Sequence, residues 1–213
     1  MQRKHLPVCV SLASALSFLA LSCDDYDKWT TSPHAILEMS ADTLAWDTLI
    51  STVPSTTKVL TVYNHGDRGL RISKVHLGKK ALSPFRANVD GQSLFQGEGE
   101  DFEVRRKDSI VVRLECTLPE TGQSGPVRME DELLFTLESG VQQRVLLSAD
   151  AQDAYVIRGL VLQQDSVFHT DKPYVIYDSL RVDSGARLTL LPGTTLMFHD
   201  KAGLDVYGTL SAE

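Results

Sequence analysis

The sequence contains little cysteine and no long apolar run. Its three cysteines are Cys9, Cys23 and Cys116. The largely apolar stretch at residues 6–21 is shorter than the run of about 20 residues that crosses a bilayer as a helix. This stretch therefore predicts a signal peptide and not a durable membrane span.

An excess of basic residues is also absent. The formal charge is −7, and removal of residues 1–22 takes away Arg3 and Lys4, which leaves 19 basic against 28 acidic residues, a charge of −9. Such a body repels nucleic acid and anionic lipid. We therefore expect no nucleic-acid partner. The basic residues of the mature chain are dispersed, without stacking aromatics between them: Arg71, Lys74, Lys79, Lys80, Arg105, Arg106 and Lys107.

No recognisable catalytic or metal-binding motif occurs in the mature part. No nucleophile elbow, phosphate loop or dinucleotide fingerprint is present, and His199-Asp200 falls where a turn is expected. We predict no catalytic, cofactor-binding or metal-binding residue and no enzymatic activity for this chain. The histidines are isolated, without a zinc-type spacing: His34, His65, His76, His169 and His199.

Two acidic clusters could supply oxygen ligands to calcium. One comprises Glu98, Glu100, Asp101 and Glu103, and the other is residues 130–132. Neither follows an EF-hand or a calcium-binding nonapeptide pattern. We interpret both clusters as solvated loops.

The end of the predicted signal peptide carries a further motif. Leu19-Ala-Leu-Ser-Cys23 resembles a lipobox, in which a small residue precedes the cut and the cysteine thiol accepts diacylglycerol. Ordinary secretion is the alternative, because Ala20-Leu-Ser22 also suits the usual signal peptidase, which would cut at the same bond. We predict a signal peptide at residues 1–22 and lipidation of Cys23.

Residues 23–35 predict a flexible tether, since they lack an apolar period. Asp24, Asp25 and Asp27 follow the cysteine, and such residues resemble the surface-export signal of lipoproteins in the phylum Bacteroidota. In enterobacteria an aspartate here implies retention in the inner membrane, and a plain solvated linker is a further alternative. We expect a lipid-anchored protein of the outer membrane that faces the exterior, with the periplasmic face as the alternative.

From residue 36 to 152 short β-type runs alternate with turn clusters, and no helical period is sustained. In residues 110–116 a period of two places Cys116 on the apolar face, so it reads as a small buried hydrophobe and not as a nucleophile. The number of strands suits a β-sandwich. Expected strands are residues 43–49, 57–63, 70–77, 85–89, 108–117, 132–138 and 141–149.

Residues 62–75, VYNHGDRGLRISKV, are similar to a signature of immunoglobulin-like domains found in cilium and spindle proteins and their bacterial counterparts. Asn64 and Gly66 would close a turn, and Leu70 and Ile72 would begin the next inward face. The resemblance implies an immunoglobulin-like β-sandwich at residues 36–152. Such modules usually serve as spacers or docking modules.

In residues 153–213, apolar pairs start at eight-residue steps at Leu180, Leu188, Leu196 and Leu204, which makes a 24-residue coil of three strands. An antiparallel meander has the same spacing. In residues 180–213, LRVDSGARLTLLPGTTLMFHDKAGLDVYGTLSAE, the motifs V-x-x-G-A-x-L, P-G-T and V-x-G-T-L-x-A follow one another. This order closely resembles the opening coils of right-handed parallel β-helix proteins. The whole sequence therefore predicts an all-β protein, in which a sandwich is followed by the first coil of such a β-helix.

Together these features resemble a family of Bacteroidota surface lipoproteins with β-helix repeats. Only about one coil precedes Glu213, so we expect a truncated chain or a fragment. The resemblance implies a structural or binding role toward glycan or protein at the cell surface, with the membrane contacted through lipid on Cys23. The alternative is the non-catalytic front of a β-helix enzyme that degrades polysaccharide.

Overall fold

The computed structural model describes residues 28–212, so the predicted signal peptide and Cys23 lie outside the described part. The described residues form two five-stranded sheets and three three-stranded sheets. They contain no helix that is long and apolar enough to span a bilayer. The protein is therefore all-β in this part, as the sequence predicts, with one short 3₁₀ turn, η1 (Lys80–Leu82).

The first large sheet is antiparallel throughout. Because β8 pairs with β3 on one side and β5 on the other, it is the central strand. In spatial order the strands are β1 (Glu38–Met39), β3 (Lys58–Asn64), β8 (Asp108–Cys116), β5 (Phe85–Val89) and β6 (Gln92–Ser93).

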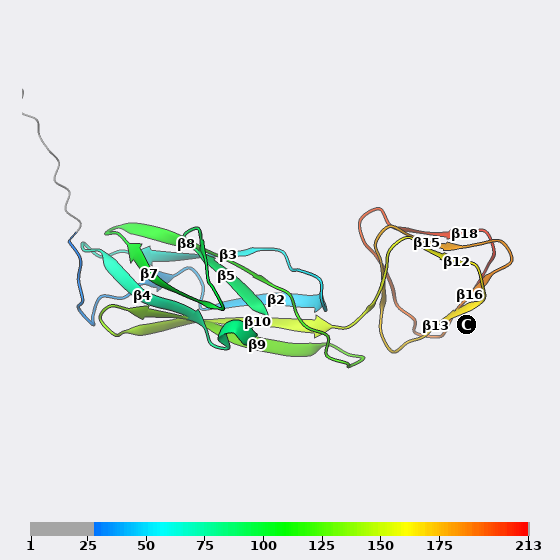
Figure 1. Ribbon diagram of the computed structural model, residues 1–213, viewed down its shortest axis with the longest axis horizontal. Coiled ribbons are helices and arrows are strands. Elements are labelled where there is room, and N and C mark those ends of the chain that lie inside the picture. The colour runs from blue at the N-terminus through cyan, green and yellow to red at the C-terminus, as the bar shows by residue number, and fades with distance from the viewer. Residues whose placement is uncertain (1–27, 213) are drawn as a thin grey trace, which may run out of the picture.

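The second large sheet contains one parallel pair, β2 with β10, and is otherwise antiparallel. Strand β10 leads directly into the last part of the chain (Figure 1). In spatial order the strands are β2 (Thr43–Ile50), β10 (Gln142–Gln152), β9 (Val127–Leu137), β4 (Leu70–Leu77) and β7 (Glu98–Val104).

The two sheets pack face to face as a β-sandwich around one apolar core. In β8 the residues Ile110, Val112, Leu114 and Cys116 are all buried while Arg113 is exposed, so the predicted alternation is confirmed. The rings of Trp46 and Phe85 lie 5.5 Å apart between the sheets. Each inward face therefore follows from the two-residue period of a strand.

One acidic cluster lies in a strand and not in the loop that we expected. Glu98, Glu100, Asp101 and Glu103 belong to β7, which pairs with β4 at the edge of the second sheet. The apolar pair Phe102 and Val104 is buried and gives this strand its inward face. Because this strand has four acidic residues and only two buried apolar ones, its two-residue apolar period is hard to recognise in the sequence.

The other acidic cluster is also strand. Residues 130–132 lie inside β9, which starts five residues earlier than the predicted strand at 132–138. Glu132 forms an ion pair with Arg144 of β10 at 3.3 Å. Cross-strand cations of this kind let acidic residues occupy a strand, so the loop interpretation was wrong for both clusters.

Residues 155–212 form three short sheets, which we call the parallel segment because every pairing between its strands is parallel. The antiparallel meander is therefore excluded. The sheets are β11 (Tyr155–Ile157), β14 (Tyr174–Ile176) and β17 (Leu196–Phe198); β12 (Leu160–Leu162), β15 (Ser179–Val182) and β18 (Gly203–Val206); and β13 (Ser166–Phe168), β16 (Arg187–Leu190) and β19 (Thr209–Ala212).

The parallel segment has its own apolar cluster, separate from the sandwich core. Leu180 pairs with Leu204, 24 residues further on, as predicted. Leu188 pairs with Leu210, 22 residues further on, so the step is not uniform. About one coil was expected, which would give each sheet about one strand, but each sheet has three strands. The additional strands are β19 and the four strands in residues 155–176, whose apolar pairs are too irregularly spaced to show the repeat.

The tether that we predict to be flexible, residues 23–35, contacts the sandwich from its first described residues. Trp29 forms a parallel bridge with Gly69, and the Thr30 N–H donates to the Gly69 carbonyl at 3.0 Å. The Arg71 guanidinium lies 4.7 Å from the centre of the Trp29 ring. The chain is thus fixed to the sandwich immediately after Lys28.

Gly69 makes this attachment possible. A Cβ at this position would lie 2.5 Å from the Trp29 ring. We predict that Gly69→Ala lowers the free energy of unfolding by about 1–3 kcal/mol, because the ring must be displaced. Chemical denaturation checks this, with Trp29→Ala and the double variant completing a cycle. Equal effects of Gly69→Ala with and without Trp29 would contradict the contact.

Candidate functional site

Two features of the described residues are candidates for function. One is the junction where the sandwich continues into the parallel segment, and the other is a groove on the side of the sandwich. Cys23, the predicted lipidation site, lies outside the described residues. Neither feature was predicted from the sequence.

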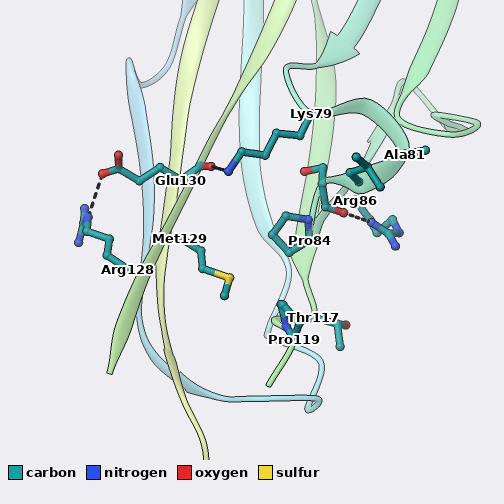
Figure 2. A pocket seen from close by; sticks show the side chains of 11 residues that line it. Lys79, Ala81, Pro84, Arg86, Thr117, Pro119, Arg128, Met129 and Glu130 are labelled. Atoms are coloured by element: carbon teal, nitrogen blue, oxygen red, sulfur yellow. Dashed lines mark hydrogen bonds and ion pairs between the residues drawn. The ribbon is translucent and has the colours of Figure 1, made fainter. Parts of the chain in front are cut away.

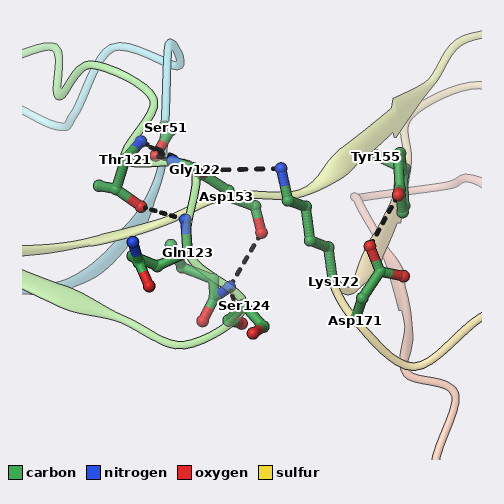
Figure 3. A network of polar contacts seen from close by, with 10 residues as sticks. Ser51, Thr121, Gly122, Gln123, Ser124, Asp153, Tyr155, Asp171 and Lys172 are labelled. Carbon is green, nitrogen blue, oxygen red and sulfur yellow. Dashed lines mark hydrogen bonds and ion pairs between the residues drawn. The ribbon is translucent and has the colours of Figure 1, made fainter.

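The junction is organised by Asp153, which follows β10 directly and has an exposed fraction of 1%. Its carboxylate accepts hydrogen bonds from the Ser51 hydroxyl at 2.7 Å, the Gly122 N–H at 2.7 Å and the Thr121 N–H at 3.0 Å. Ser51 follows β2, and the other two donors lie in the loop between β8 and β9 (Figure 3). Donors from two separate parts of the sandwich therefore converge on one carboxylate.

The parallel segment contacts the same carboxylate. The Lys172 ammonium, from the loop between β13 and β14, lies 3.6 Å from the second Asp153 oxygen. Beside it, the Tyr155 hydroxyl donates to Asp171 at 2.8 Å, and the Tyr155 N–H donates to the Pro173 carbonyl at 2.9 Å. Asp153 is thus shared by the two parts of the chain (Figure 3).

These donors determine the charge of Asp153. They lower its pKa from 3.8 to about 2, chiefly through the Thr121 N–H and the Ser51 hydroxyl, with a smaller contribution from Lys172, while burial opposes the shift. A carboxylate with several donors keeps its charge because each hydrogen bond favours the ionised form. Asp153 is therefore an anion at any pH above about 4 and serves as a fixed structural charge.

The groove lies between β5 and the start of β9 and has a volume of about 660 Å³. Pro84, Pro119 and Met129 supply its apolar surface (Figure 2). The Lys79 ammonium donates to the Glu130 carbonyl at 2.6 Å, and Arg86 donates to the Ser83 carbonyl at 2.6 Å. The cations at its rim are therefore engaged with the protein itself.

The residues considered as chemical candidates remain apart in the structure. The described residues contain no group of three or more His, Cys, Asp or Glu side chains that could hold a metal ion. His199 and Asp200 lie at the turn after β17, as expected. His199 stacks on Tyr177 with the ring centres 4.7 Å apart.

Cys116 is fully buried and is a free thiol, as the sequence predicts. Burial raises the pKa of this thiol. A neutral thiol in an apolar core is a poor nucleophile. Cys116 is one of the buried residues that form the sandwich core.

No family model and no curated protein matches the sequence. Among solved structures, the PapD-like domain 7 of human CEP192 is similar to 58% of the chain, at 17% identity, 90% coverage of that domain and a TM-score of 0.37. A protein of unknown function from Porphyromonas gingivalis matches 70% of the chain and 60% of its own length, with 17% identity and a TM-score of 0.35.

A family 123 glycoside hydrolase from Clostridium perfringens matches 61% of the chain at 5% identity and a TM-score of 0.41, and the match spans only 26% of the hydrolase. All three TM-scores lie below 0.5. These likenesses therefore assign neither a fold family nor a function to this chain.

The charge of Asp153 makes the stability of the junction depend on pH. Because its pKa is lower in the folded state than the usual 3.8, its contribution is complete above about pH 4 and is lost as the pH falls toward about 2. We predict that Asp153→Asn lowers the melting temperature by several degrees at pH 7 and flattens the acid limb of the stability curve.

Calorimetry between about pH 2 and pH 7 measures both effects. Asp178→Asn is the matched control, because Asp178 is exposed and lies in the bend between β14 and β15 of the parallel segment. An acid limb that is identical in the wild type and in Asp153→Asn would contradict this role of Asp153.

Proposed function

We propose that this chain is a lipid-anchored protein of the cell envelope, attached through Cys23 and displayed on the outer surface. The sandwich, which we interpret as immunoglobulin-like, serves as a spacer. The parallel segment is the beginning of a right-handed parallel β-helix, and its outer faces meet glycan or protein. The role is structural or binding and not enzymatic.

The observation that carries this proposal is the placement of the two attachments on the sandwich. Lys28 and Trp29 join it beside Gly69, at the end where β4 begins. The parallel segment leaves from Asp153, at the opposite end (Figure 1). A lipid ahead of Lys28 would therefore have the whole sandwich between it and the parallel segment.

The length of the strands gives the size of the spacer. Strand β10 has 11 residues and runs from one end of the sandwich to the other. At about 3.3 Å per residue it spans roughly 36 Å. A spacer of this length would lift a binding surface clear of the lipid headgroups.

The junction supports the same proposal. The sandwich can hold the parallel segment in a fixed direction only if the connection between them resists bending. Asp153 has hydrogen bonds to Ser51, Thr121 and Gly122 of the sandwich and an ion pair with Lys172 of the parallel segment. The sandwich and the parallel segment are therefore both bound to the same carboxylate, which restricts bending between them.

Energy transfer from labelled protein to dye-labelled headgroups tests the proposed arrangement. The lipidated chain is placed in vesicles with a donor at Glu138→Cys, near the Trp29 end, or at Ser184→Cys, in the parallel segment. We predict strong transfer from position 138 and weak transfer from position 184, because roughly 36 Å of sandwich separates the two ends. The buried Cys116 does not compete for the label.

The anchor is checked by incorporation of labelled palmitate in cells that produce the full-length precursor. Cys23→Ser should abolish incorporation and release the protein from the vesicles. Equal transfer from the two positions would contradict the spacer. Palmitate entering Cys23→Ser as well as the wild type would contradict the anchor.

A further inference from the structure

The parallel segment consists of three stacked coils, and the one nearest the sandwich in sequence has unusually apolar strands. We call residues 155–168, with β11, β12 and β13, the N-terminal coil. The middle coil holds β14, β15 and β16, and the C-terminal coil holds β17, β18 and β19. Apart from Ser166, every strand residue of the N-terminal coil is apolar or aromatic, and none is charged.

The outward positions distinguish the N-terminal coil from the other two. Its outward residues are valines on all three sides, Val156, Val161 and Val167, with exposed fractions of 40%, 43% and 47%. Parallel strands that are apolar on both faces are typical of sheets with both faces covered. In two of the three sheets the other coils carry charged or hydroxyl residues in register with these valines: Arg181 and Asp205 beside Val161, and Thr189 and Ser211 beside Val167.

The N-terminal coil has a free edge. Its strands stand first in their sheets, so each pairs only with a strand of the middle coil, and no strand of residues 28–212 lies on the other side. Tyr155 is 42% exposed there, and Leu160 is 39% exposed although Leu180, its partner in the middle coil, is fully buried. We call these strand edges, with Tyr155, Leu160 and the three valines, the free face.

The two charged residues of the N-terminal coil, Arg158 and Asp165, contact the middle coil. The Arg158 guanidinium lies 4.0 Å from the centre of the Tyr177 ring, and the Asp165 carboxylate accepts from the Arg187 N–H at 2.8 Å. Exposed strand edges usually resist pairing through charged side chains, especially lysine, or through proline. The three strands at the free face have neither.

We propose that the free face pairs with the free face of a second copy of this chain. The mature chain has a net charge of −9, so two copies repel each other over most of their surfaces. The repulsion is weakest, and the gain from burying apolar surface is greatest, where an uncharged apolar face meets its own copy. Twofold symmetry closes this contact, because each copy then covers the strand edges of the other.

This pairing leaves the outer surface of the other two coils accessible. Figure 1 looks nearly along the stack of coils, since β12, β15 and β18 overlap in the view, while the sandwich extends to one side. A second copy that meets the free face therefore approaches along the stack. The outward residues of the middle and C-terminal coils then stay exposed, and the pairing depends neither on the lipid nor on the ligand proposed above.

Sedimentation velocity of the mature chain with Cys23→Ser tests this pairing without a lipid. Between about 1 and 100 µM we expect the sedimenting species to change from one copy to two. Val161→Lys and Val167→Lys, each made alone, should weaken the dimer by roughly tenfold or more, because the symmetry brings two like charges into one interface. Each lysine also makes the whole chain less negative, which by itself would favour association.

The matched control is Val59→Lys, which makes the same substitution on the outward face of β3 in the sandwich, where Val59 is 56% exposed. It should change the dimer affinity by less than about twofold, since it lies on a different surface. Melting temperatures verify that the variants fold. Val161→Thr keeps the shape of the side chain and should give a smaller loss that remains measurable if a lysine at 161 unfolds the chain.

Hydrogen exchange at low and high protein concentration locates the contact. We expect the amides of residues 155–168 to exchange more slowly at high concentration, with no change at residues 196–212. Three results would overturn the pairing: a single copy at every concentration, equal losses in Val59→Lys and Val161→Lys, or slower exchange at residues 196–212 in place of 155–168.

Discussion

The structure depends on the burial of one carboxylate, that of Asp153, at the point where a sheet of the sandwich gives way to the parallel segment. An ionised group so close to full burial is tolerated only when hydrogen bonds replace its lost water. Ser51, Thr121 and Gly122 provide those bonds from the sandwich, and Lys172 adds a cation from the other side. The two parts of the chain therefore meet at a polar contact that both help to satisfy.

Much of the sandwich could be predicted from the sequence because its strands alternate clearly. The strands at Leu70–Leu77 and Phe85–Val89 begin and end where the pattern places them, and Cys116 lies on the predicted inward face. Strand β7 was missed because its buried residues are few beside its many carboxylates. Its carboxylates Glu98 and Glu103 form ion pairs with Lys74 and Arg71 of β4, which are distant in sequence.

The functional features are less visible in the sequence because they arise from contacts between distant residues. Nothing near Asp153 indicates that it will be buried, since its partners lie at positions 51, 121, 122 and 172. Arg68 and Arg105 look dispersed in the sequence, yet the single amide of Asn64 binds the backbone carbonyls of both. Local sequence patterns therefore predict the strands but miss both the junction and the contact between the two loops that Asn64 joins.

The central claim is that the sandwich and the parallel segment behave as one rigid unit because Asp153 joins them. Pulsed electron resonance between spin labels at Gln142→Cys and Ser184→Cys, in the Cys23→Ser background, tests it most directly. The account predicts one narrow distance distribution at pH 7 and a much broader one after Asp153→Ala. A wild-type distribution as broad as that of the variant would contradict the claim.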